Sequence, residues 1–180
     1  MIPLLWVDLE TTGLDPTKDL ILEVAMVATD AELNVQGEWQ GILHHPQPFL
    51  ESRLNEVTRQ MHSNNGLISE CQCHEALAPY AAYNSIKMWI LDHNFNGRPM
   101  AGSNPSFDRG FLKAQMSEVE RLFHYRSFDV NTLHAFFGFN KDKNRVDSHR
   151  AMDDIDRDID AVKRYRRAIP DDLHLTDNLP

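Results

Sequence analysis

The stretch LLWVDLETTGLDP, residues 4–16, decides the fold and holds the first candidate site residues. Residues 4–7 are an apolar run typical of a buried strand, and the acidic residues Asp8 and Glu10 follow at its end. Side chains two residues apart on a strand point to the same face of the sheet, so these two carboxylates face the same way. Residues 11–16 contain a glycine and a proline, which predict a turn.

The rest of the chain predicts an α/β fold. Strands are expected at about 20–29 and 35–44, which with the first strand form an antiparallel meander, and two short strands at 99–102 and 127–130. Because the strands come first and helices then alternate with the short strands, the order predicts a mixed sheet covered by helices. Helices are expected at about 52–62, 74–93, 107–116 and 148–168. A further helix is expected to follow the strand at 127–130 and to end by Gly138.

The end of the chain is expected to hold one long helix. Ser148 is a plausible N-cap for it, Ala151, Ile155, Ile159 and Val162 form its buried stripe, and Pro170 ends it. Residues 139–147 read as a charged loop. We therefore expect one domain over residues 1–169 and a loose tail over 170–180.

Composition excludes several classes of protein. A chain of 180 residues that is 42% hydrophobic can form a core without disulfides. No apolar run approaches the roughly 18 residues needed to cross a bilayer and no secretion signal is visible, so we expect no membrane association. Two cysteines one residue apart, Cys71 and Cys73, fit the reducing cytoplasm. The net charge of −9 argues against gripping long nucleic acid by phosphate neutralisation alone, although metals can bridge an acidic protein to phosphates.

Three acidic residues are candidate metal ligands. Asp8 and Glu10 repel each other on one face, and near a core such a pair is costly unless a cation holds it. Two solvated acids at an exposed strand end fit the pattern as well. Asp108 follows the polar turn at 102–106 at the head of a helix, where an aspartate is also an ordinary first-turn residue.

The segment SHRAMDD, residues 148–154, holds a candidate base. Within one helix His149 faces Asp153, four residues on, whereas Asp154 is rotated by about 140°. If Ser148 caps the helix, His149 stands at its start and can turn toward another partner. The spacing alone leaves Asp153 and Asp154 open.

Taken together, these motifs resemble the DEDDh group of 3′→5′ exonucleases, which has the ribonuclease H-like fold. The resemblance rests on Asp8-x-Glu10, TGLDP at 12–16, GSNxxxD at 102–108 and HxxxxD at 149–154. The stretches WVDLE at 6–10, TDAELN at 29–34 and FHYR at 123–126 are similar to the oligoribonucleases in particular. The similarity extends over about residues 4–167. It implies a mixed five-stranded sheet flanked by helices.

The resemblance also implies the chemistry. It makes Asp8, Glu10, Asp108 and Asp154 the ligands of two divalent cations, Mg²⁺ or Mn²⁺, and His149 the general base. It selects Asp154 over Asp153 because the histidine of that family precedes its last aspartate by five residues. The implied reaction trims short RNA oligonucleotides from the 3′ end to 5′-mononucleotides.

A further set of residues is implied on the substrate side. Leu14 matches a leucine that wedges between bases, and Tyr125 and Arg126 match a pair that reaches across a homodimer to the neighbouring active site. The arginine fork suits a terminal phosphate. His62 matches a substrate-side histidine. Core packing for Tyr125, a surface ion pair for Arg126 and a helix-end position for His62 are the alternatives.

Three further substrate-side positions, Thr11, Asn104 and Asn131, depart from the oligoribonuclease pattern. Thr11 replaces a methionine and brings the first motif closer to proofreading DNA exonucleases. Asn104 and Asn131 replace serines that cap phosphates, and an asparagine can still donate to phosphate. These departures leave open a substrate of single-stranded DNA or longer RNA. A non-catalytic nucleotide-binding module is a further alternative.

Overall fold

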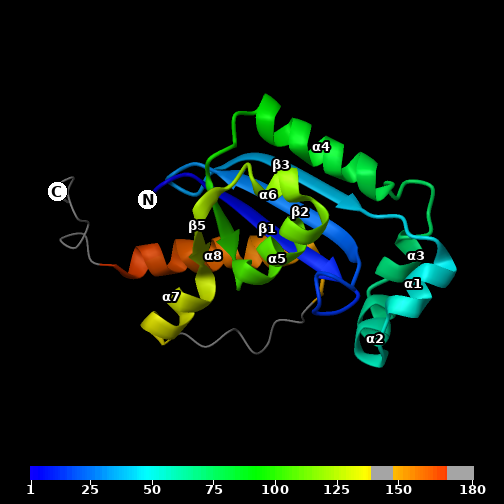
Figure 1. The fold of residues 1–180 in the computed structure, drawn as a ribbon. Coiled ribbons are helices and arrows are strands. Elements are labelled where there is room, and N and C mark those ends of the chain that lie inside the picture. The colour runs from blue at the N-terminus through cyan, green and yellow to red at the C-terminus, as the bar shows by residue number, and fades with distance from the viewer. Residues whose placement is uncertain (139–147, 170–180) are drawn as a thin grey trace.

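The computed structural model describes residues 1–138 and 148–169, which form a mixed five-stranded sheet with helices on both faces (Figure 1). The strand order is β3-β2-β1-β4-β5. The pairs β1–β2 and β2–β3 are antiparallel, whereas β4 is parallel to β1 and β5 is parallel to β4. The predicted meander and mixed sheet are therefore confirmed. The strands are β1 Leu4–Thr11, β2 Ile21–Thr29, β3 Val35–Ile42, β4 Pro99–Gly102 and β5 His124–Asp129.

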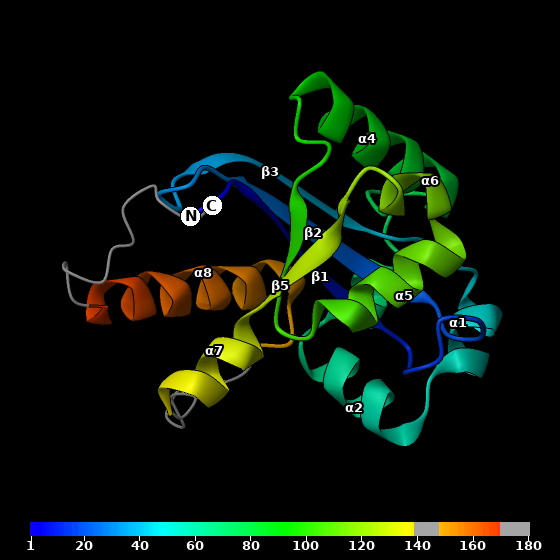
Figure 2. The same ribbon diagram turned by 60° about the vertical axis from the view of Figure 1, so that its left-hand side comes forward.

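The helices follow the strands in the expected order. They are α1 Gln47–Arg53, α2 Glu56–Asn64, α3 Leu67–Glu70, α4 Pro79–Asp92, α5 Pro105–Gln115, α6 Ser117–Glu120, α7 Val130–Phe137 and α8 Ala151–Ala168. Figure 2 shows α8 on one side of the sheet and α4, α5 and α6 on the other. In the part of the chain that the structure describes, every helix is too short or too polar to cross a lipid bilayer.

Strand β1 separates two cores. Leu5 and its alternate neighbours join the core under α4, α5 and α6, whereas Leu4 and Trp6 join the core under α8. The expected apolar stripe of α8 packs in this second core, with Ile155 and Ile159 buried. By the same alternation, Asp8 and Glu10 point to the face that α8 covers.

Several predicted helix boundaries are wrong. The helix expected at 52–62 is two helices, because Asn55 starts α2 with a capping box that it forms with Thr58. The helix expected at 74–93 begins only at Pro79, and that expected at 107–116 begins at Pro105. Proline is favoured in the first helical turn because its missing N–H would be unpaired there. Strand β5 begins at His124 and not at residue 127.

The predicted cap of the last helix is also wrong. Helix α8 begins at Ala151 with Arg150 in the N-cap position, so Ser148 lies before it. The Ala151 N–H donates instead to the Glu23 carboxylate of β2 at 3.2 Å, so a side chain distant in sequence does the work of the cap. The expected loop at 139–147, the stop at Pro170 and the expected tail over 170–180 lie outside the described residues.

Candidate active site

Acidic side chains meet at the C-terminal end of β1. Asp8 and Glu10 of β1 and Asp154 of the first turn of α8 each offer a carboxylate oxygen, and these oxygens lie within 4.8 Å of one another. Glu10 is only 7% exposed. Asp153, in contrast, is exposed. The geometry thus favours Asp154, which the spacing alone could not distinguish from Asp153.

Asp108 reaches the same strand from α5. Its side chain is 3% exposed, and its Oδ1 accepts a hydrogen bond of 3.1 Å from the N–H of Leu9, which stands between Asp8 and Glu10. Asp108 is not one of the three carboxylates grouped within 4.8 Å. It lies near enough to Asp8 to raise the pKa of that carboxyl.

Burial and mutual repulsion make this cluster costly to ionise. The pKa of Asp8 is raised well above its usual value, first by burial and then by the charges of Asp108, Asp154 and Glu10. Burial raises the pKa of Asp108 to about 7. Carboxylates are the preferred ligands of hard divalent cations, and such a cation offsets their repulsion. The residues present therefore fit a divalent metal.

Asp158 was not among the predicted site residues. It is buried on α8, accepts a 2.9 Å hydrogen bond from the Ser103 hydroxyl, and adds to the repulsion that raises the pKa of Asp8. Its position four residues after Asp154 puts both on one face of the helix, and this spacing was the signal in the sequence.

Divalent metal is expected to stabilise the protein more at pH 8 than at pH 5. At pH 5 folded Asp108, with a pKa of about 7, holds a proton that an unfolded aspartate, with a pKa of about 3.9, has lost, and the raised pKa of Asp8 acts in the same direction. Their contribution to stability is present at low pH and is lost as pH rises through the folded pKa. Metal replaces these protons, so Mn²⁺ at 100 times its Kd adds about 3 kcal/mol at pH 8.

Thermal melts in EDTA and in Mn²⁺ measure this effect. We expect the Tm to rise by about 5–10 °C at pH 8 and by less than half of that at pH 5. An equal rise at the two pH values would contradict the protonation argument.

His149 stands just before α8. It is half-buried, has a left-handed backbone with φ of 48°, and lies close enough to His62 to lower the pKa of that histidine. His62 is fully buried, and its Nε2 donates to the Thr11 carbonyl at 2.9 Å. Burial is the main cause of its lowered pKa. His62 thus lies beneath the end of β1, and its contact with substrate stays a prediction.

The turn after β1 carries two of the predicted substrate residues. Leu14 is 84% exposed, as a side chain that wedges between bases must be. The Thr11 hydroxyl is buried and donates to the Gly13 carbonyl at 2.7 Å, so it shapes this turn.

The two asparagines are brought together by one carboxylate. Asp129 Oδ1 accepts the backbone N–H of Asn104 at 3.2 Å and that of Asn131 at 2.9 Å. Asn104 is exposed and precedes α5, whereas Asn131 lies in the first turn of α7. The two asparagines predicted to contact phosphate therefore lie close together, one at the start of α5 and one at the start of α7.

Tyr125 and Arg126 lie away from the acids. They are on the edge strand β5, and β4 separates them from β1. Pro99 pairs with His124 and Met100 with residue 127. Tyr125 and Arg126 therefore have no partner on β4 and form a bulge in β5. Tyr125 is 74% exposed, which rules out core packing, and the Arg126 guanidinium lies 5.4 Å from the centre of its ring.

Comparisons with known structures support the fold. The chain is similar to E. coli exonuclease I in a zinc-bound complex with single-stranded DNA, with a TM-score of 0.67, 18% identity, and coverage of 94% of this chain and 41% of that one. It is also similar to exonuclease I from Methylocaldum szegediense, with a TM-score of 0.68, 17% identity, and coverage of 95% and 42%. The chain thus spans about two fifths of these exonuclease I chains, and at this identity the likeness concerns the fold alone.

Sequence comparisons define the family. The family model described as "Exonuclease" matches residues 5–162. The chain is 36% identical over 171 residues to an oligoribonuclease of Pseudoalteromonas translucida, covering 91% of this chain and 93% of the relative. It is 37% identical over 177 residues to an oligoribonuclease of Xylella fastidiosa, covering 92% and 89%. The chain therefore belongs to the exonuclease family and, within it, to the oligoribonucleases.

Proposed function

We propose that the chain is a 3′→5′ exoribonuclease that hydrolyses short oligoribonucleotides to 5′-mononucleotides. Membership of the oligoribonuclease family supports the reaction class. The observation that carries the proposal is the convergence of Asp8, Glu10 and Asp154 within 4.8 Å at the end of β1. A non-catalytic binder would gain nothing from so costly a cluster.

Each residue of the site has a chemical role in this proposal. Two divalent cations, Mg²⁺ or Mn²⁺, held by Asp8, Glu10, Asp108 and Asp154, would stabilise charge at the scissile phosphate. His149 accepts a proton from the attacking water while the oxygen of that water forms a bond to phosphorus. The bond from phosphorus to the 3′ oxygen breaks, that oxygen takes up a proton from solvent water to become the new 3′ hydroxyl, and His149 returns its proton to solvent.

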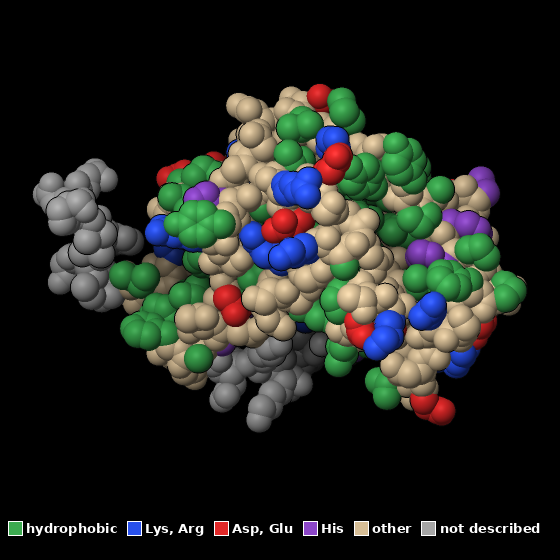
Figure 3. All heavy atoms as spheres, viewed as in Figure 1, with side chains coloured by type: hydrophobic (Ala, Val, Ile, Leu, Met, Phe, Trp, Pro, Cys, Tyr) green, Lys and Arg blue, Asp and Glu red, His purple; other side chains and the backbone are tan. Residues whose placement is uncertain are grey.

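The turn after β1 and the two helix starts bind the substrate in this proposal. Leu14 inserts between the last bases, and Thr11 keeps the turn in place through its bond to Gly13. Asn104 and Asn131, held by Asp129, donate to phosphate. Figure 3 shows basic and acidic side chains interspersed on the face drawn there, without a continuous basic surface for a long strand.

Turnover is expected to fall steeply with substrate length. Labelled RNA and DNA oligomers of two, five and twenty nucleotides, incubated with Mn²⁺, measure this dependence. We expect kcat/KM for the shortest RNA to exceed that for the longest by more than about tenfold, because in this proposal the enzyme contacts only the last nucleotides of the strand and gains no binding energy from the rest.

Two other outcomes would point elsewhere. Indifference to length would favour the second candidate, an exonuclease on single-stranded DNA or longer RNA, which the replacement of capping serines by Asn104 and Asn131 favours. Binding without hydrolysis in saturating Mg²⁺ would favour a nucleotide-binding module.

We further propose that the enzyme acts as a homodimer. Tyr125 and Arg126 bulge from an edge strand and are remote from the acids of their own chain, which suits contact with the substrate of a neighbouring protomer. Residues 1–169 act as one exonuclease domain in this proposal. Cys71 and Cys73 are both free, which fits the cytoplasm.

A further inference from the structure

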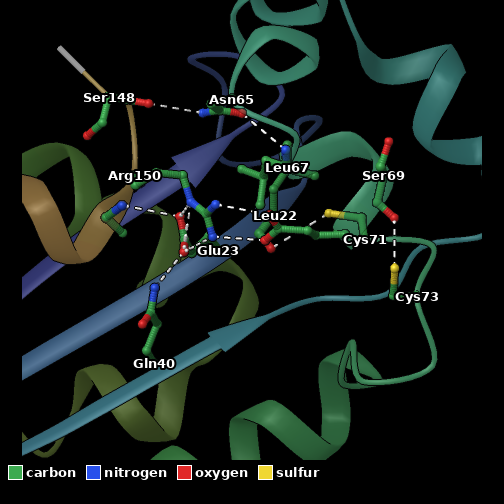
Figure 4. Close-up of polar contacts among 12 residues, drawn as sticks. Leu22, Glu23, Gln40, Asn65, Leu67, Ser69, Cys71, Cys73, Ser148 and Arg150 are labelled. Atoms are coloured by element: carbon green, nitrogen blue, oxygen red, sulfur yellow. Dashed lines mark hydrogen bonds and ion pairs between the residues drawn. The ribbon is translucent and has the colours of Figure 1, made fainter. Parts of the chain in front are cut away.

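An ion-pair network holds the segment before α8 to the sheet. The Arg150 guanidinium pairs with the carboxylates of Glu23 and Glu70, and Figure 4 shows it beside Glu23. Its Nε and Nη2 donate to Glu23 at 3.1 and 3.0 Å, and its Nη1 and Nη2 donate to Glu70 at 3.1 and 2.9 Å. Both interactions use the planar fork of arginine, which a lysine cannot reproduce.

Glu23 depends on this network. Its side chain is 0% exposed, and on the sheet it lies directly opposite Glu10. Like charges directly opposite each other are unfavourable, so a counterion is needed. Arg150 provides it, while Gln40 and the Ala151 N–H fill the other acceptor positions of the carboxylate at 2.8 and 3.2 Å. Glu23 thereby joins β2, the strand paired with β1, to the start of α8.

Asn65 holds the same segment from the other side. Its amide Nδ2 donates to the carbonyl of His149 at 2.6 Å and to that of Ser148 at 3.3 Å, and its Oδ1 accepts the N–H of Leu67 at 3.1 Å. Figure 4 shows Asn65 reaching residue 148 from the turn after α2. His149 has φ of 48°, which a non-glycine residue adopts only when its surroundings enforce it.

We propose that Arg150, together with Glu23 and Asn65, is a positioning residue that fixes the backbone of His149 at the acidic cluster. Arg150 bonds to Glu23, and the next residue, Ala151, bonds to the same carboxylate. Glu23 thus fixes the backbone that follows His149, while Asn65 holds the carbonyls of Ser148 and His149. This inference rests on the proposed function, in which His149 is the general base. Arg150 acts through His149 and touches no reacting atom.

The rival explanation is that Arg150 only neutralises a buried carboxylate. Loss of Arg150 would then lower stability and leave kcat unchanged in whatever protein remained folded. If Arg150 positions His149, kcat falls while KM stays the same, because displacement of a catalytic group by about 1 Å can cost up to about a hundredfold in rate.

Three variants separate the two explanations. Arg150→Lys keeps the charge but not the fork, and we expect kcat on a labelled five-nucleotide RNA with Mn²⁺ to fall by about tenfold with KM within about twofold. Arg150→Met leaves Glu23 buried without its counterion and can fail to fold. Glu23→Gln/Arg150→Met removes both charges, so its Tm is expected to recover while kcat stays low.

Arg98→Met is the matched control. Arg98 is partly buried, as Arg150 is. It donates to the backbone carbonyl of Thr29, at the end of the sheet away from the acidic cluster. We expect this variant to lower Tm and to leave kcat unchanged. Recovery of kcat in Glu23→Gln/Arg150→Met, or an equal loss of kcat in Arg98→Met, would overturn the positioning role.

A double-mutant cycle with His149→Ala tests whether Arg150 acts through that histidine. In single-turnover reactions Arg150→Lys is expected to slow the wild-type background about tenfold and to leave the residual rate of His149→Ala unchanged. Equal losses in both backgrounds would reject the positioning role alone. Wild-type activity of His149→Ala would instead reject the proposed base, and with it the inference.

Discussion

Asp154→Asn is expected to lower kcat about a thousandfold, whereas Asp153→Asn leaves it within about twofold. The two residues are neighbours on α8, but only Asp154 places its carboxylate within 4.8 Å of Asp8 and Glu10. An amide keeps the shape and loses the charge that holds a cation. A thousandfold loss corresponds to about 4 kcal/mol of transition-state stabilisation, which is within the range that a bound metal provides. Single-turnover hydrolysis of a labelled oligoribonucleotide measures both variants.

Both variants are expected to remain folded. Asp154 pairs with Arg157 at 2.7 Å on the same helix, and the loss of this partly buried pair is offset by the loss of its repulsion with Asp8. Melting curves in EDTA verify this point. Wild-type activity in both variants would show that the site does not use Asp154. A large loss of activity in Asp153→Asn as well would show that the variants disturb the start of α8 and do not act through a single ligand.

Much of the fold follows from short-range patterns in the sequence. Strands β1, β2 and β4 are buried, largely apolar runs, and the stripe of α8 follows the helical period, so these could be predicted. The start of α8 could not. Ser148 is a good cap by residue type, but the Ala151 N–H bonds to Glu23, which is 128 residues away in sequence. Local sequence does not reveal a cap that comes from another strand.

The site shows the same division. Asp8 and Glu10 could be placed together because side chains two residues apart on a strand point to the same face. The assignment of Asp108 and Asp154 to the same site came from the resemblance. Helical period left Asp153 and Asp154 open, because it could not show whether His149 lies within the helix. The structure puts His149 two residues before α8 begins. The roles of Arg150 and Asn65 depend on contacts between distant segments, which no spacing along the chain reveals.

Arg126→Ala is expected to lower kcat/KM by about a hundredfold, and a partner with an intact Arg126 is expected to restore it. An arginine that donates two charge-assisted hydrogen bonds to a terminal phosphate contributes about 3 kcal/mol. Arg126 lies on the edge strand, away from the acids of its own chain. In a homodimer it would serve the other active site, so the loss can be complemented between chains.

Heterodimers of Arg126→Ala and Asp8→Ala chains, isolated with two affinity tags, test this arrangement. One of the two sites then combines an intact Asp8 with the partner's Arg126, and we expect about half of the wild-type activity. Heterodimers of Asp8→Ala and Asp154→Ala chains are the matched control, since both changes damage the acidic cluster of their own chain and no site is intact. Recovery only in the first heterodimer requires that Arg126 acts across the interface. Equal inactivity of both heterodimers, with dimers confirmed by sedimentation, would mean that Arg126 acts within its own chain. Wild-type activity of the Arg126→Ala homodimer would mean that it does not act at all.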